Sequence, residues 1–244
     1  MAMSSSSATQ RLADHVRVCR FDDRLIFLDL SRGKYIGIGG PLVGALFAVL
    51  CGDGIGANVS EASSDRQLQT AIKRLRDQQL MSDTSAQRPK RPSAIAAIEP
   101  VASLSIDGVR ESAQADWRTL LRLWRATIVA TIWLRRLNLS DIVNRVMALR
   151  TRNHAAEANA DDHALLAAVA SYVRLRPFAL TSHDRCLKDS LTLILFLAGQ
   201  GLFPEWVIGV RIHPFGAHSW VQRRGVVLND FAERVRHYRA ILVV

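Results

Sequence analysis

The chain has 244 residues, of which 49% are hydrophobic and 22% are charged, and this composition excludes both wholesale disorder and a fibrous architecture. A formal net charge of +10 favours an anionic partner, which could be nucleic acid, an anionic membrane surface or an acidic peptide. The basic residues are scattered along the chain, so ordinary solvated side chains explain the charge equally well. We therefore expect no nucleic-acid partner.

The N-terminal segment 1–12 is rich in serine and lacks the apolar centre of a signal peptide, which predicts a polar tail. Two later apolar stretches, 120–134 and 191–212, are interrupted by arginines or by glycine and proline. Neither supplies the run of about 20 apolar residues that a membrane span needs. We expect a cytoplasmic protein with no transmembrane segment.

Cysteine usage argues against both disulfides and a structural metal. Cys19, Cys51 and Cys186 are an odd number at wide spacing, which fits neither a disulfide framework nor a paired zinc knuckle. The sequence predicts no metal site and no cofactor in this chain, and it leaves a thiol available for chemistry.

The first domain is predicted over residues 13–82. Three short β-like runs are separated by residues typical of tight turns, and two amphipathic helical segments follow them. The strands are expected at Val16–Phe21, Leu25–Leu30 and Lys34–Ile38, and the helices from Pro41 to Leu50 and over 64–78. This order predicts a small winged-helix-like domain with a three-stranded antiparallel sheet.

Residues 83–100 are rich in Ser, Ala, Gln, Arg and Pro and are predicted to be a linker. The second domain, 101–244, begins with a mostly helical part that extends to residue 176. Its helices are expected at 113–137, 139–150 and 161–173. The first of them places a set of large apolar residues on or near one stripe: Trp117, Leu120, Leu121, Trp124, Ile128 and Ile132.

The end of the chain changes from helical to strand periodicity. An apolar helix begins almost at Cys186 and reaches Ala198, with Thr181, Ser182 or Asp184 as its N-cap. Strict alternation then predicts antiparallel strands over 206–212, 218–222 and 226–228. The predicted fold class is α+β, with a papain- or transglutaminase-like C-terminal domain in which helices pack on an antiparallel sheet.

Three residues in this region have the chemistry of a cysteine peptidase. A thiol in the first turn of a helix has a lowered pKa, and Cys186 is at that position. A histidine must hold the proton and a third polar group must orient it. His218 shares a strand face with Trp220, and Asp230 follows one hairpin later, so both are expected to point toward the helix. We predict a catalytic triad of Cys186, His218 and Asp230.

Each of these residues also has an ordinary structural explanation. Cys186 could be a small core residue, His218 a strand residue and Asp230 a turn former. Two other histidines compete for the catalytic role. His183 precedes the helix but has no acidic partner at a sheet position, and His213 is in a hairpin loop where it could touch substrate.

The residues around the triad resemble a known family. Arg185-Cys186-Leu187, Ala217-His218-Ser219-Trp220-Val221 and Val227-Leu228-Asn229-Asp230 are similar in order and spacing to the lasso peptide maturation B proteins, whose C-terminal domain is a transglutaminase-like peptidase. The segment from Leu25 to Tyr35 resembles the small leader-recognition domain that is similar to the pyrroloquinoline quinone chaperone. Both halves thus resemble parts of the same maturation pathway.

The resemblance implies a cysteine peptidase that binds the leader of a ribosomally made lasso precursor and cleaves leader from core. Cys186 would attack the bond, His218 would act as base and then acid, and Asp230 would orient it. The leader would add an edge strand to the first domain. The peptide-binding residues would be Lys34, Tyr35, Ile36, Ile38, Leu68, Ile72 and Leu75.

The resemblance also implies a partner, a cyclase similar to asparagine synthetase that consumes ATP and closes the ring. Two other functions remain open from sequence. The first is a transglutaminase-like hydrolase or acyl transferase acting on another peptide, since the same thiol chemistry passes an acyl group to water or to an amine. The second is a non-enzymatic winged-helix DNA-binding protein, which the strand-first order disfavours.

Overall fold

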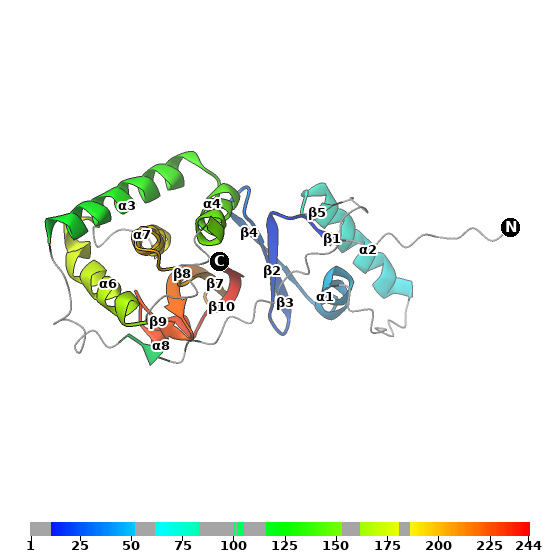
Figure 1. The fold of residues 1–244 in the computed structure, drawn as a ribbon. Helices are drawn as coiled ribbons and strands as arrows, with labels where there is room; N and C mark the ends of the chain where they lie inside the picture. The colour runs from blue at the N-terminus through cyan, green and yellow to red at the C-terminus, as the bar shows by residue number, and fades with distance from the viewer. Residues whose placement is uncertain are drawn as a thin grey trace. The chain divides into compact units, whose positions relative to one another are not determined.

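The computed structural model describes residues 11–51, 62–82, 100, 102–104, 116–152, 162–180 and 186–244. The chain divides into two compact units, Met1–Ala94 and Ile95–Val244 (Figure 1). The predicted linker 83–100 lies outside the described residues apart from Pro100. Each unit is therefore considered by itself.

The first unit contains the three predicted strands in an antiparallel sheet of order β2-β3-β4. The strands are β2 Val16–Arg20, β3 Arg24–Asp29 and β4 Lys34–Gly39, and the helices are α1 Val43–Cys51 and α2 Ala62–Asp77. Gly33 connects β3 to β4 with a positive φ of 63°, which a residue without Cβ adopts at low cost. The sheet and both helices agree with the sequence prediction.

A short second sheet in this unit was not predicted. β1, Arg11–Leu12, pairs antiparallel with β5, Met81–Ser82, at the other end of the unit. β1 falls within the segment assigned from sequence to a polar tail. Two residues are too few to show an alternating pattern, so only the paired structure identifies them as a strand.

The second unit is built on a five-stranded sheet of order β10-β7-β8-β9-β6. Its strands are β6 Ala102–Ser103, β7 Glu205–Arg211, β8 Gly216–Arg223, β9 Val226–Val227 and β10 Arg239–Val243. Its helices are α3 Trp117–Arg136, α4 Leu139–Arg152, α6 Asp162–Leu175, the 3-10 turn η2 Arg176–Phe178, α7 Cys186–Ala198 and α8 Ala232–Val235. The α+β class is confirmed. The sheet is mixed rather than wholly antiparallel, because β6 pairs parallel with β9.

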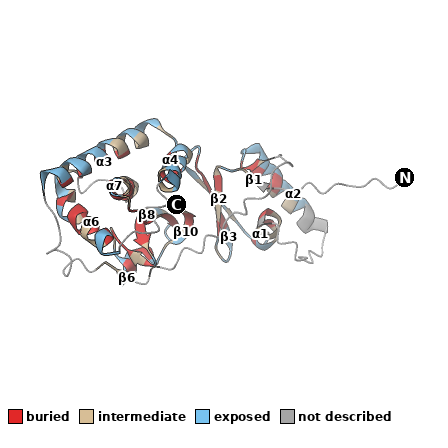
Figure 2. Cartoon of the chain, in the orientation of Figure 1, coloured by how far each residue is buried: buried red, intermediate tan, exposed pale blue. Residues whose placement is uncertain are grey.

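Helix α7 is the central helix of this unit. It contacts α3, α4 and α6 and also packs on β7 and β8 (Figure 1). Most of its residues are buried, as expected for a helix that is apolar on all sides (Figure 2). The indole N–H of Trp206 on β7 donates to Ser190 of α7 (3.0 Å) and to Ser219 of β8 (2.8 Å), and these two hydroxyls are 2.7 Å apart. This buried network fixes the helix on the sheet.

The apolar stripe of α3 does not form its buried face. Five of the six stripe residues are exposed, with exposed fractions from 45% for Trp124 to 66% for Trp117; the others are Leu121, Ile128 and Ile132. The buried face is made instead by smaller residues, Thr119, Leu123, Ala126, Thr127 and Ala130. Small side chains let α3 approach α7 closely, which explains why this face and not the larger one is inside.

The side of the sheet away from α7 has a separate core. Val207, Trp220 and Val227 pack there against Ala232 and Val235 of α8.

None of the helices in the described segments has the length and apolarity that a membrane crossing requires.

Gly209 marks a place on this side of the sheet where no side chain fits. A Cβ at Gly209 would lie 2.7 Å from the Trp220 ring and 3.0 Å from the Cβ of Tyr238. We expect Gly209→Ala to lower the free energy of unfolding by about 1–3 kcal/mol, because the ring must shift in a packed core. Urea unfolding measures this change. Gly199→Ala is the control, since its new Cβ would come no closer than 3.6 Å to the neighbouring atoms; equal stability of the two variants would contradict the expectation.

Candidate active site

Cys186 is the first residue of α7, as the sequence predicts. The N-cap candidates Thr181, Ser182 and Asp184 lie outside the described residues. The half-buried thiol hydrogen-bonds to the His218 side chain and to the backbone N–H groups of Ser219 and Leu187. Burial alone would raise the pKa of the Cys186 thiol, but the hydrogen bond and charge of His218, together with these amides, lower it below its ordinary value. The sulfur is therefore stabilised as a thiolate.

His218 lies on β8 between the thiol and a carboxylate. Its Nε2 is 2.6 Å from Oδ2 of Asp230, which leaves Nδ1 for the Cys186 thiol. Burial acts to lower the pKa of His218, but the hydrogen bonds and charges of Asp230 and Cys186 outweigh it and raise the pKa to about 9. The imidazole is thus held as a cation near neutral pH, and its charge favours the thiolate form of Cys186.

Asp230 follows β9 and is nearly buried, with 10% of its side chain exposed. Its Oδ1 accepts a hydrogen bond from the Phe231 N–H (2.8 Å) and is 3.2 Å from the Arg234 guanidinium. Burial would raise the pKa of this carboxyl, but the His218 hydrogen bond and these donors lower it. The carboxylate stays ionised and orients the imidazole. The three predicted site residues are therefore brought together in the structure.

His218 reaches the thiol at the first residue of α7 from the face of β8 opposite to the one that packs on the rest of this helix. In the β7–β8 pairing, Ser219 is the residue whose hydroxyl contacts α7, through Ser190. His218 and Trp220 alternate with it and lie on the opposite face, where Trp220 joins the core under α8. The imidazole still reaches the thiol, which belongs to the first residue of α7. Alternation alone could not show this, because it assigns residues to faces without saying which face meets the helix.

Two aromatic residues that were not assigned to the site flank His218. The Trp220 ring centroid is 6.2 Å from that of His218, with the planes 22° apart, and the Tyr238 centroid is 5.2 Å away. Both rings limit the positions that the imidazole can take. Trp220 could be found from sequence, because strand alternation places it on the same face as His218. Tyr238 could not, because only the path of the chain between α8 and β10 brings it here.

Of the competing histidines, His213 is exposed in the turn between β7 and β8, and His183 lies outside the described residues. No group of three or more His, Cys, Asp or Glu side chains suited to a metal ion occurs in the described part of the chain.

The seven residues predicted to bind peptide fall into two classes. Lys34 is exposed and Tyr35, Ile36, Ile38 and Leu68 are half-buried, with Ile36, Ile38 and Leu68 packed around the core of the first unit. Ile72 and Leu75 are inside that core, with exposed fractions of 3% and 0%. These two side chains are occupied in holding α2 to the unit, so their assignment as surface contacts is corrected.

The family model of the transglutaminase-like superfamily matches residues 124–243, a range that runs from α3 to the end of β10 and contains the whole thiol–imidazole–carboxylate arrangement. Residues 124–243 are thus similar to a transglutaminase-like domain. Domains of this superfamily are in general cysteine enzymes of the peptidase and acyltransferase type. Searches of curated proteins and of solved structures gave no match for the chain.

Proposed function

We propose that this protein is a cysteine peptidase that binds the leader of a ribosomally made lasso peptide precursor and cleaves leader from core. The observation that carries the proposal is the arrangement of Cys186, His218 and Asp230 within a transglutaminase-like domain. A thiolate beside an oriented imidazolium is the starting state of thiol-dependent acyl transfer.

The chemistry follows from the positions of the protons. The Cys186 thiolate attacks the carbonyl carbon of the peptide bond, and the backbone N–H of Cys186 helps to hold the negative oxygen. The His218 imidazolium then gives its proton to the departing amine as the C–N bond breaks, which leaves a thioester on Cys186. Water attacks the thioester while the neutral imidazole takes one of its protons. The peptide leaves with a free carboxyl group, and the Cys186 thiolate and the His218 imidazolium are restored.

The first unit supplies a site for the leader in this proposal. β4 is an edge strand of the described three-stranded sheet, so an extended peptide can add beside it through main-chain hydrogen bonds. Ile36, Ile38 and Leu68 border the same core and offer partly buried apolar surface for alternate leader side chains. Recognition by the first unit and cleavage by the second would explain why both are present in one chain.

Leu68→Glu tests this leader site. We expect it to weaken binding of a fluorescently labelled leader peptide to the full chain by at least about tenfold, because apolar leader contacts would have to cover a carboxylate. Fluorescence anisotropy measures the affinity. Gln69→Glu adds the same charge at the neighbouring exposed position of α2 and should change the affinity less than about twofold. Equal effects of the two variants would argue against the site.

The function itself is tested by mass spectrometry of a short precursor peptide, encoded beside the gene for this protein, after incubation with the full chain. We expect cleavage at one bond between leader and core. The freed core amine would then be used by a separate cyclase similar to asparagine synthetase, which consumes ATP. No cleavage of the precursor, with or without that cyclase, would contradict the proposal.

The transglutaminase-like match also supports a second candidate, an acyl transferase or hydrolase that acts on another peptide. The thioester on Cys186 is common to both functions, and the difference is whether water or an amine receives the acyl group. The leaving amine is released in both reactions, so an acyl fragment that carries the mass of an added amine, in place of a free carboxyl group, would identify the transferase.

A further inference from the structure

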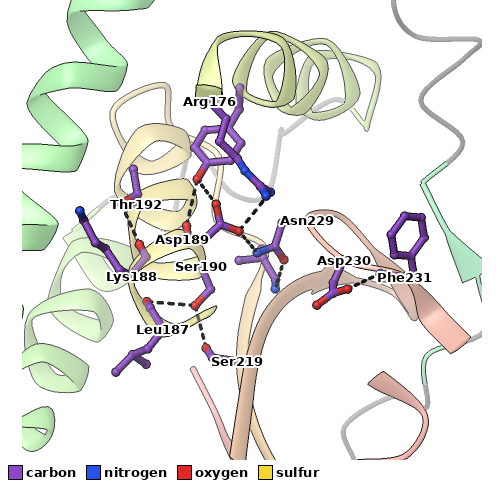
Figure 3. A network of polar contacts seen from close by, with 12 residues as sticks. Arg176, Leu187, Lys188, Asp189, Ser190, Thr192, Ser219, Asn229, Asp230 and Phe231 are labelled. Carbon is purple, nitrogen blue, oxygen red and sulfur yellow. Dashed lines mark hydrogen bonds and ion pairs between the residues drawn. The ribbon is translucent and has the colours of Figure 1, made fainter. Parts of the chain in front are cut away.

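The side chain of Asn229 connects the three elements that carry the triad. Its Oδ1 accepts a hydrogen bond from the Val221 N–H of β8 (2.8 Å), and its Nδ2 donates to Oδ2 of Asp189 on α7 (2.9 Å; Figure 3). Val221 is three residues after His218, Asp189 is three residues after Cys186, and Asn229 immediately precedes Asp230. One amide group thus joins all three segments.

Asp189 is itself held firmly, although it is an acid in an apolar helix. It is 8% exposed, and its carboxylate accepts from the Tyr172 hydroxyl (2.8 Å) and lies 3.4 Å from the Arg176 guanidinium (Figure 3). Because a carboxylate only accepts hydrogen bonds, it fixes which way the Asn229 amide points. Nδ2 faces the carboxylate and Oδ1 faces the Val221 N–H, an orientation that an aspartate at position 229 could not satisfy.

The segment bearing Asp230 needs such a tether because regular sheet pairing has ended before it. β9 stops at Val227, and the Leu228 N–H donates to the Val221 carbonyl (2.9 Å). Residues 228–230 form bends. A displacement of this segment would lengthen the 2.6 Å contact between Asp230 and His218, and with it the imidazole would lose its orientation.

We infer that Asn229 is a positioning residue of the Cys186–His218–Asp230 site and that Asp189 is its anchor. The inference rests on the proposed thiol chemistry of Cys186, but its test needs no peptide substrate. The rate at which iodoacetamide alkylates Cys186 reports how much thiolate the imidazole maintains at each pH. Peptide mapping confirms which cysteine is labelled.

Three variants of the full chain decide the matter. Asn229→Asp places a carboxylate against Asp189, which should raise the thiol pKa and lower the alkylation rate at pH 6 by about tenfold. Asp189→Asn should have a smaller effect in the same direction. The double variant Asp189→Asn/Asn229→Asp restores an amide–carboxylate pair with its two ends exchanged, and should recover most of the wild-type rate.

Thr192→Ala is the matched control. It removes a fully buried side chain from the same helix, and the hydrogen bond that is lost, from the Thr192 hydroxyl to the Lys188 carbonyl (2.8 Å), lies within α7 and not in the segment bearing Asp230. We expect it to lower the thermal unfolding midpoint while leaving the pH profile of alkylation unchanged. If the alkylation rate depended only on the stability of the protein, the control variant would lower it as Asn229→Asp does.

The inference is overturned if Asn229→Asp and Asp189→Asn fold and retain the wild-type alkylation profile, or if Thr192→Ala changes the profile as much as they do. If Asn229→Asp does not fold, Asp189→Asn still decides, since an unchanged alkylation profile in that variant also overturns the inference. Failure of the proposed function is distinguishable, because the wild-type protein would then keep its reactive Cys186 and cleave no precursor.

Discussion

Replacing Cys186 with alanine is expected to abolish cleavage of the precursor, with a loss of at least about 10³-fold, because no other group in the site can form the thioester. The substitution removes one half-buried sulfur at the start of α7 and leaves the His218–Asp230 contact in place. Leader binding should be unchanged, since the predicted leader site belongs to the other unit. Mass spectrometry of the precursor and anisotropy of the labelled leader measure the two effects separately.

Cys19 offers a matched control for this loss. It lies on β2 and is buried, with 5% of its surface exposed, in the unit that does not contain the site. Cys19→Ala should therefore retain cleavage, and Cys19 should react with iodoacetamide far more slowly than Cys186 below pH 7. Cleavage retained by Cys186→Ala would remove Cys186 as the nucleophile.

The sequence predicted those parts of the structure that depend on local pattern. Alternation at Trp206, Ile208 and Val210 identified β7, and the residues around His218 identified β8, because one or both faces of these strands are buried. The position of Cys186 at the start of a helix followed from the change between a polar segment and an apolar one. These features need no knowledge of distant contacts.

Other features depend on contacts between segments that are far apart, and sequence did not reveal them. β6 is paired to β9 across more than a hundred residues, and its two residues carry no pattern. The inward face of α3 is decided by how closely α7 approaches it, so Ala126 and Ala130 are buried while Trp117 and Trp124 are exposed. Hydrophobicity predicts that the face with the large apolar residues is buried, because it reflects the size of the apolar surface. It does not reflect how well α7 fits against each face of α3.

In the active site, too, some residues could be predicted from local sequence and others depend on contacts between distant segments. Cys186, His218 and Asp230 could be predicted because their chemistry restricts the residue types and the spacing. Asp189 and Asn229 could not, since an acid in a helix and an asparagine in a turn each have common local explanations. Only the 2.9 Å contact between them shows that they act on each other.

Asp230→Asn should narrow the pH range in which the enzyme works, and it should do so from both sides. In the native protein, cleavage should rise with pH as the thiol loses its proton, at a pKa lowered below the ordinary cysteine value. Cleavage should fall as pH increases through about 9, where His218 loses the proton that the leaving amine requires. The carboxylate of Asp230 is one of the groups that raise the pKa of His218.

Without that charge, the pKa of His218 should fall, which moves the alkaline limb of the profile to lower pH. A less stable imidazolium also supports the thiolate less well, so the acid limb should move to higher pH. At pH 7 we expect cleavage to fall by about 10-fold to 100-fold, less than for Cys186→Ala because a neutral amide still accepts a hydrogen bond. The pH dependence of kcat/KM measures both limbs, and an NMR titration of His218 measures its pKa directly. Glu233→Gln is the control, because it removes an exposed acid from α8 nearby and should leave both limbs of the pH profile in place. If the Asp230→Asn profile were identical to the native one, Cys186 and His218 would act as a dyad.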